Sequence, residues 1–330
     1  MRPDPADTVR TPLPVSTVVR FREVLTPLSA ITGSTPPRRT LGSVLSAYVG
    51  LTKPRIIELL LVTTVPTMML AARGLPTWWT LAATLVGGIL AAGSANVFNC
   101  YVDRDIDEKM RRTRRRPLAR HAVTPRSALV FGIVLGTAAT AWLALTVNPL
   151  SAGLADATIL FYVFVYSMGL KRRTSQNVVW GGAAGCMPAL IGWSAVTGTV
   201  SWPAATLFLV IFFWTPPHTW ALGLRYREDY AAAGVPMLPV VAPATVVARR
   251  IVYYTWAMVA ASLVLWPLAT GWIYGASAVV LGMAFLVFAY RLRGEARRGA
   301  ALSSFALFKW SNSYLSLLFV AVAVDALVLH

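Results

Sequence analysis

Three polar side chains at helical spacing form the first candidate site in the sequence. Asn99, Asp103 and Asp107 lie at positions i, i+4 and i+8, so a helix that continues past the membrane surface would carry them on one face. Two carboxylates and an amide oxygen suit Mg²⁺, which prefers hard oxygen ligands and shares them with substrate phosphates. The arginines of Arg111–Arg116 follow and suit phosphate binding. The pattern predicts a metal–diphosphate site, and the alternative is a set of membrane-orientation charges neutralised by nearby acids.

A second group of candidates follows the sixth apolar segment. Pro216 and Pro217 are expected to break or kink their helix and free backbone carbonyls, which a membrane tolerates inside the protein or at a cavity. His218 stands at that point, where it either satisfies a freed carbonyl or contacts a ligand. Glu228 and Asp229 lie in the joint that follows. Since this joint comes four helices after the first acidic joint, we expect the two to face each other.

Two further basic stretches, Lys53–Arg55 and Lys171–Arg173, flank apolar segments. Each is explained either by the positive charge that membrane proteins carry on their cytoplasmic side or by diphosphate binding. Several other acids fall off the polar stripe or near the opposite face and are expected to be solvated or structural. These are Asp105, Glu108, Asp156 and Asp325.

A largely apolar chain must position these groups. Of its 330 residues, 56% are hydrophobic and 13% are charged, and the mean hydropathy is +0.61. A soluble domain carries about 25% charged residues, so a soluble protein is excluded. The net charge of +17 fits basic loops of a membrane protein, whereas nucleic-acid binding would leave the hydropathy unexplained. Cys100 and Cys186 lie in separate apolar stretches without a metal-ligand pattern, so neither a disulfide framework nor a zinc site is expected.

Apolar runs long enough to cross a bilayer, about 20 residues each, alternate with short polar joints from residue 56 onward. Residues 1–45 hold 7 of the 21 prolines and are expected to form a disordered cytoplasmic tail before a transmembrane domain at 46–330. A nine-span topology places 29 of the 30 Lys and Arg on one side, which puts the N-terminus in the cytoplasm. The expected fold class is all-α, a polytopic bundle with spans at 56–72, 77–98, 127–147, 149–170, 178–197, 202–224, 251–270, 272–290 and 310–329.

Several stretches between residues 50 and 241 carry a family resemblance. They are LTKPRII (51–57), NCYVDRDIDEKMRRTRRRPL (99–118), LKRRTSQN (170–177), CMPALIGW (186–193) and FFWTPPHTWALGLRYREDYAAAGVPMLPVV (212–241). Together they resemble the UbiA-type intramembrane prenyltransferases, and the last stretch is similar to the branch that farnesylates protohaem IX. The three helices after residue 241 match this family mainly in number and hydrophobicity.

The resemblance implies a UbiA-like bundle with a Mg²⁺-dependent site. In the wider superfamily the second motif has two aspartates four residues apart, and Arg225 stands in place of the first. Asp229 therefore either serves a single metal or positions Arg225. The implied catalytic residues are Asp103, Asp107 and Asp229; the metal ligands are Asn99 and the same three aspartates. Diphosphate binding is implied for Arg55, Arg112, Arg116, Lys171 and Arg225, and haem or substrate binding for His218 and Tyr230.

The implied reaction moves a farnesyl group from farnesyl diphosphate to a vinyl group of protohaem IX and adds water, giving haem O and diphosphate. The implied setting is the bacterial plasma membrane, in preference to the mitochondrial inner membrane, with the active site facing the cytoplasm. Haem A synthase and haem-copper oxidase assembly factors are the implied protein partners, and no nucleic acid is expected. The alternatives are a prenyltransferase for an aromatic or quinone precursor, a non-catalytic haem carrier and a transporter. A transporter would place ionisable residues near the membrane midplane, whereas here they crowd one end.

Overall fold

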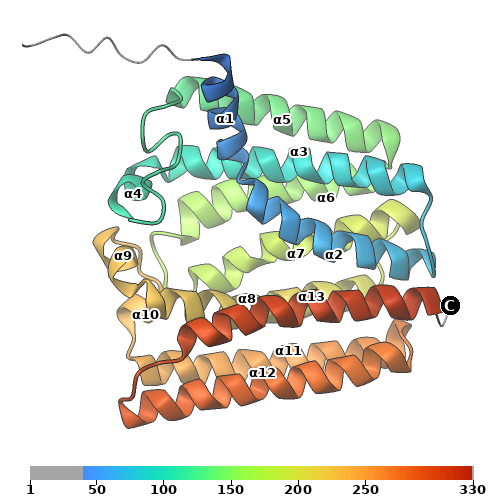
Figure 1. Ribbon diagram of the computed structural model, residues 1–330. Helices are drawn as coiled ribbons and strands as arrows, with labels where there is room; N and C mark the ends of the chain where they lie inside the picture. The colour runs from blue at the N-terminus through green and yellow to red at the C-terminus, as the bar shows by residue number, and fades with distance from the viewer. Residues whose placement is uncertain (1–39, 329–330) are drawn as a thin grey trace, which may run out of the picture. The chain divides into compact units, whose positions relative to one another are not determined.

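The part of the chain that the structure describes is built from helices. A computed structural model describes residues 40–328, without the side chains of residues 55–61 (Figure 1). In chain order the elements are α1 (Leu41–Thr52), α2 (Pro54–Ala72), α3 (Trp78–Val102), α4 (Arg104–Lys109), α5 (Pro125–Thr146), α6 (Pro149–Leu160), the π-helix η1 (Phe161–Leu170), α7 (Asn177–Thr197), α8 (Trp202–Arg225), α9 (Arg227–Ala232), α10 (Leu238–Val241), α11 (Ala244–Ala269), α12 (Trp272–Arg298) and α13 (Ser304–Val328).

Eight helical segments within residues 40–328 are long and apolar enough to cross a membrane. They are α3, α5, the continuous pair α6–η1, α7, α8, α11, α12 and α13, and they correspond to eight of the nine predicted spans. The remaining predicted span, 56–72, falls on α2, whose side chains are described at Pro54 and from Val62 onward. The expected all-helical membrane fold is therefore confirmed. Most of the predicted tail lies outside the described residues, and its last part, 41–45, already belongs to α1.

Local sequence signals explain where several spans begin. Thr124 and Asn148 each accept a hydrogen bond from a backbone N–H three residues ahead, and each is followed by a proline at the first helical position. At the N-terminus of α12 the buried carboxylate of Asp325, from α13, accepts hydrogen bonds from the backbone N–H groups of Gly271 and Tyr274. This carboxylate is therefore structural, as expected from the sequence.

Of the two effects expected of Pro216 and Pro217, a break or a kink of the helix, the break does not occur. Both prolines lie inside α8, which continues from Trp202 to Arg225. Proline is tolerated in a membrane helix because neighbouring side chains and small adjustments satisfy the backbone groups that it frees. His218 consequently lies on a helix and not in a loop.

Small residues let the helices approach closely. A Cβ atom added to Gly87 of α3 would lie 2.4 Å from Leu143 of α5, and one added to Gly181 of α7 would lie 2.1 Å from the Tyr166 ring. Close backbone approach at small residues is the usual basis of helix packing in lipid. At Gly181 this close approach also sets the position of the Tyr166 ring, which belongs to η1, beside the candidate site.

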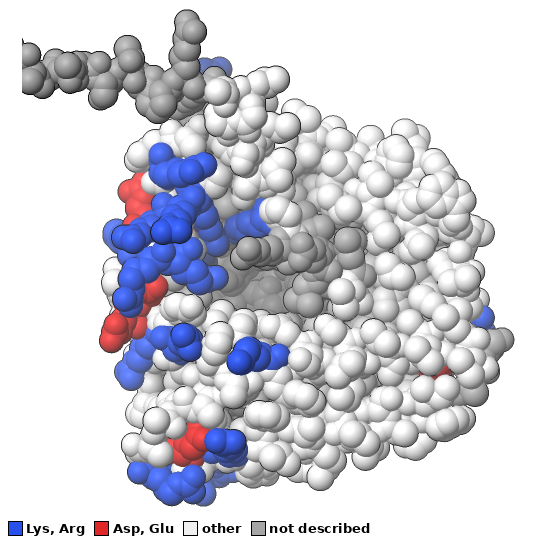
Figure 2. Space-filling model, in the orientation of Figure 1, with Lys and Arg blue, Asp and Glu red and all other residues white. Residues whose placement is uncertain are grey.

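Charged side chains gather at one end of the bundle. Figure 1 shows the short helices α4, α9 and α10 at the same end, beyond the long helices. In Figure 2 most of the visible Lys and Arg, with several acids among them, lie at this end, and the rest of the visible surface is largely uncharged. The polar joints that the sequence singled out thus meet at one membrane face.

Candidate active site

A polar cavity opens among the joints at the charged end of the bundle. Its lining includes side chains from α3, α4, the loop after α4, η1, α7, α8 and α9. Of the predicted site residues, those lining it are Asn99, Asp107, Arg112, Arg116, Lys171 and Tyr230. The structure therefore brings together residues that are up to 131 positions apart in the chain.

Asn99, Asp103 and Asp107 form the predicted stripe, although the helix does not run on unbroken. α3 ends at Val102 and α4 begins at Arg104, with Asp103 at the joint. The Asp103 N–H donates to Asn99 O and the Asp107 N–H to Asp103 O, both at 2.9 Å, so the helical spacing persists across the joint. All three residues are buried, with exposed fractions of 3%, 0% and 2%.

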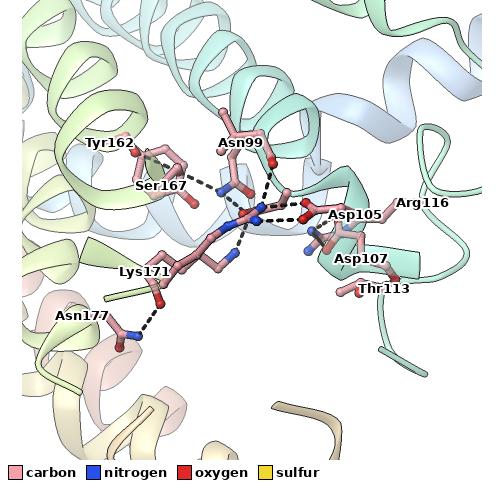
Figure 3. Close-up of polar contacts among 12 residues, drawn as sticks. Asn99, Asp105, Asp107, Thr113, Arg116, Tyr162, Ser167, Lys171 and Asn177 are labelled. Atoms are coloured by element: carbon pink, nitrogen blue, oxygen red, sulfur yellow. Dashed lines mark hydrogen bonds and ion pairs between the residues drawn. The ribbon is translucent and has the colours of Figure 1, made fainter. Parts of the chain in front are cut away.

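Each acid of the stripe is paired with a cation. Figure 3 shows one of these acids, Asp107, beside Arg116. Lys171 Nζ donates to Asp103 Oδ2, and Arg116 Nη1 donates to both oxygens of Asp107 at 2.8 and 2.7 Å. Burial opposes the charge of Arg116, but the acidic groups around it, with Asp107 foremost, together outweigh burial and raise the pKa of the guanidinium. Asn99 Nδ2 donates to Asp103 Oδ2 at 2.8 Å, whereas Asp103 Oδ1 is buried without a hydrogen-bond partner among the described residues.

Lys53 also reaches the stripe, although its sequence context fits an orientation charge equally well. Its Nζ donates to Asn99 Oδ1 at 2.5 Å and lines the cavity. Burial lowers the pKa of Lys53 to about 8, and the charges of Arg116 and Lys171 act in the same direction. The residue adopts a left-handed conformation (φ 54°) between α1 and Pro54, which turns the chain at the cavity. The residue predicted in this stretch is Arg55, whose side chain lies outside the described residues, and not Lys53.

The π-helix η1 places Ser167 and Lys171 beside the stripe. Backbone hydrogen bonds five residues apart define a π-helix, and the bond from the Lys171 N–H to Tyr166 O, at 2.9 Å, is one of them. Within the helix the Ser167 hydroxyl donates to Tyr162 O, also at 2.9 Å. Ser167 Oγ in turn accepts a hydrogen bond from Asn99 Nδ2 at 3.0 Å. π-Helical turns often occur at functional sites. The apolar run predicts an ordinary span over 149–170 and gives no sign of the roles of Ser167, Tyr162 and Tyr166.

The two acidic joints face each other, as expected. Arg111 Nε donates to Asp229 Oδ1 of α9 at 2.8 Å, which raises the pKa of Arg111. The next arginine, Arg112, donates to the Tyr230 hydroxyl at 3.2 Å. Asp229 Oδ2 is buried and has no hydrogen-bond partner within the described part of the chain.

Arg225 does not take the predicted position. Its guanidinium lies over the Phe305 ring at 4.2 Å, and it is not among the described residues that line the polar cavity. Asp229 pairs with Arg111 and not with Arg225. The hypothesis that Asp229 positions Arg225 is therefore wrong, because α8 ends with this side chain directed to the start of α13.

The acids off the stripe are solvated, as expected. Asp105 is 54% exposed in its side chain and pairs with Arg172, whose hydrogen bonds lower the pKa of Asp105 to about 2. Glu108 is also exposed and lies 3.8 Å from His121. Neither side chain lines the polar cavity.

His218 lines a second, more apolar cavity. The residues Tyr162, Tyr166, Val178 and Thr219 line both cavities, so the two adjoin. His218 Nδ1 lies 2.7 Å from Ser311 Oγ of α13, so the histidine bonds a side chain and not a carbonyl freed by the prolines. A third cavity, lined mainly by apolar residues of α3, α6 and α7, adjoins the other two at Tyr162.

Comparison with known proteins decides the family. The model of the UbiA prenyltransferase family matches residues 60–313. This chain belongs to that family. One relative is the Protoheme IX farnesyltransferase of Nocardioides sp., which is 62% identical over 91% of this chain and 97% of the relative. Another is the Protoheme IX farnesyltransferase of Frankia alni, which is 63% identical over 86% of this chain and 98% of the relative.

Solved structures of the UbiA family share the fold. A digeranylgeranylglyceryl phosphate synthase structure is similar with a TM-score of 0.72 and 17% identity, covering 86% of this chain and 98% of that one. A UbiA homologue from Archaeoglobus fulgidus, bound to DMAPP and Mg²⁺, has a TM-score of 0.65 and 15% identity, with 84% and 99% covered. Family membership and the eight apolar spans together make this chain an integral membrane protein.

Proposed function

We propose that this protein transfers the farnesyl group of farnesyl diphosphate to a vinyl group of protohaem IX and adds water, giving haem O and diphosphate. Relatives about 60% identical over most of the chain, all bacterial, carry the name Protoheme IX farnesyltransferase. The site observation that carries the proposal is the buried stripe of Asn99, Asp103 and Asp107. Asn99 and Asp107 line the polar cavity together with cationic side chains, and this cavity adjoins two others, whereas Asp103 lies behind its lining.

The donor set of the stripe fits Mg²⁺. Asp103 Oδ1 and Asp229 Oδ2 are buried oxygens without partners in the described part of the chain, which leaves each able to accept a cation. No cluster of three or more His, Cys, Asp or Glu with metal-holding geometry occurs among the described residues. Mg²⁺ needs no such cluster, because one or two carboxylates with substrate phosphates suffice. We propose Asn99, Asp103, Asp107 and Asp229 as its ligands; when bound, Mg²⁺ would supply positive charge to the departing diphosphate.

The cationic side chains bind the diphosphate. Lys53, Lys171, Arg112 and Arg116 line the polar cavity, and the carboxylates now hold two of them. Phosphate oxygens accept charge-assisted hydrogen bonds from these side chains just as the carboxylate oxygens do. As the bond between farnesyl C1 and the diphosphate oxygen breaks, negative charge grows on that oxygen, and the fixed cations stabilise it.

Aromatic and apolar side chains hold the carbon skeleton. The apolar cavity between α3, α6 and α7 accommodates the prenyl chain and excludes water from it. The rings of Tyr162 and Tyr166 are stacked with centroids 5.2 Å apart, and both line the diphosphate and His218 cavities. Their π-faces stabilise the positive charge that develops at C1.

The acceptor vinyl group lies in the His218 cavity and attacks C1, forming the new carbon–carbon bond. Water then adds to the resulting cation beside the porphyrin and loses a proton, which completes the hydroxyethylfarnesyl group. Tyr230, which accepts a hydrogen bond from Arg112, helps to close the cavity on the substrate. The one-sided distribution of basic residues supports a site at the cytoplasmic face. The proposed membrane is the bacterial plasma membrane.

An acceptor competition tests the proposal. The full chain is reconstituted in liposomes with farnesyl diphosphate, Mg²⁺ and equal amounts of protohaem and an aromatic quinone precursor. Farnesylated haem as the main product supports the proposal. Farnesylated quinone precursor with unchanged haem would contradict it in favour of a different UbiA-type acceptor.

A further inference from the structure

The hydrogen bonds of Ser311 determine which nitrogen of His218 carries a proton. Ser311 Oγ lies 2.6 Å from the Phe308 carbonyl and 2.7 Å from His218 Nδ1. A carbonyl only accepts, and a hydroxyl has a single proton to give. Both contacts are therefore hydrogen bonds only if Ser311 donates to Phe308 and accepts from His218. Nδ1 then carries the proton, and Nε2 of the neutral ring has a free lone pair.

The surroundings of the ring direct Nε2 to the cavity. Trp214 stacks on His218 with centroids 4.2 Å apart and an interplanar angle of 21°, and Phe308 lies at 4.7 Å. Trp214 is itself fixed by a 2.8 Å hydrogen bond from Nε1 to Ser311 O. Since the ring is flanked by two aromatic side chains and its Nδ1 edge faces Ser311, the edge with Nε2 remains to line the cavity.

We propose that Ser311 is a positioning residue that holds His218 as the Nδ1–H tautomer, so that Nε2 ligates the iron of the acceptor haem. This inference rests on the proposed function, in which protohaem occupies the cavity. The described residues that line this cavity include one imidazole; the other polar side chains among them are hydroxyls and the indole of Trp214, whose N–H donates to Ser311 O. A histidine that ligates a metal characteristically donates its second N–H to a fixed partner, and losing that partner costs about 10- to 100-fold in affinity.

The tautomer is measured first, on the full chain in detergent without haem. Long-range ¹H–¹⁵N correlations of ¹⁵N-histidine protein distinguish the two tautomers, and His218→Gln assigns the signal among the three histidines. We expect the Nδ1–H pattern for His218 and its loss or mixing in Ser311→Ala. An Nε2–H pattern in the unmodified protein would overturn the proposal, whatever the protein transfers.

Ferric protohaem titration then tests the ligation. We expect Ser311→Ala to bind haem about 10- to 100-fold more weakly, and His218→Gln to lose the spectrum of an imidazole-ligated iron. Ser313→Ala is the matched control, because Ser313 lies two residues along α13 on its exposed side. Equal affinity of Ser311→Ala and Ser313→Ala, or an unchanged spectrum in His218→Gln, would overturn the proposal. Failure of the unmodified protein to bind haem would instead overturn the proposed acceptor, and the ligation with it.

Discussion

The ion pair between Asp103 and Lys171 gives the sharpest prediction about how the site is held together. The side chains are 0% and 15% exposed, and Asp103 Oδ2 accepts from both Lys171 and Asn99. Asp103→Asn keeps the shape but leaves a buried ammonium without its counter-charge. Breaking a buried pair in this way costs about 3–5 kcal/mol. We therefore expect Asp103→Asn to lower the free energy of unfolding by about that amount.

The neighbouring pair Asp105–Arg172 supplies the matched control. These side chains are 54% and 37% exposed, and an exposed pair contributes about 0–1 kcal/mol. Asp105→Asn is therefore expected to change the stability by less than about 1 kcal/mol. The double variant Asp103→Asn/Lys171→Met should recover part of the loss, because it removes the stranded charge together with its partner.

The two cysteines provide the assay. Cys100 and Cys186 are both free and fully buried, so a thiol-reactive dye labels them when the helices separate. Unfolding is followed by dye labelling across a denaturant titration in detergent, for the single variants, the double variant and the unmodified chain. Equal midpoints for Asp103→Asn and Asp105→Asn would refute the reasoning, since they would show that the Asp103 pair is as hydrated as the exposed one.

Three further predictions concern the site and the opposite end of the bundle. Asp107→Asn should abolish farnesyl transfer while the protein stays membrane-inserted, measured by product formation and membrane extraction; normal turnover would contradict the role of the stripe. Arg116→Ala should raise the KM for farnesyl diphosphate by about 10-fold or more, since charge-assisted hydrogen bonds contribute about 1.5–3 kcal/mol. Arg225→Ala should change this KM by less than about twofold, because Arg225 lies over Phe305. Similar KM changes in both variants would contradict the geometry of the site. Asp325→Ala should lower the free energy of unfolding by about 2 kcal/mol, because two N–H groups at the start of α12 lose their acceptor. The activity per folded molecule should stay the same. Cysteine labelling measures the stability and turnover measures the activity, and unaltered stability would refute this capping role.

The membrane fold was predictable because it depends on features that sequence carries directly. A bilayer requires about 20 apolar residues per helix, and runs such as 127–147 and 202–224 have that length with polar joints at both ends. The corresponding helices, Pro125–Thr146 and Trp202–Arg225, differ from these predictions by no more than two residues at either end. The prolines of α8 do not break the helix, which was one of their two expected effects, because proline rules from soluble proteins overstate helix breaking inside a membrane protein.

The stripe was predictable from spacing, but the cations around it were only partly so. Asn99, Asp103 and Asp107 share a face because of helical periodicity, which the joint at Asp103 leaves intact. Lys53 and Arg225 both sit in basic joints, and composition does not tell which one points into the cavity. That choice depends on the left-handed turn at Lys53 and on the packing of α8 against α13.

The π-helix and the tautomer of His218 depend on three-dimensional partners. The change to backbone hydrogen bonds five residues apart over η1 leaves no periodic signal in an apolar run. Ser311 lies 93 residues after His218, so their contact arises only when α13 packs against α8. Such pairs become visible only once the helices are placed.

The most direct test of the central claim is the mass of the haem product. The reconstituted chain is incubated with protohaem, farnesyl diphosphate and Mg²⁺, with and without a chelator, and the extracted haems are measured by mass spectrometry. The proposed function predicts a haem heavier by a farnesyl group plus water, formed with Mg²⁺ and absent with the chelator and in Asp107→Asn. Unchanged haem from folded, membrane-inserted protein would contradict the claim, as would a product that forms equally in Asp107→Asn.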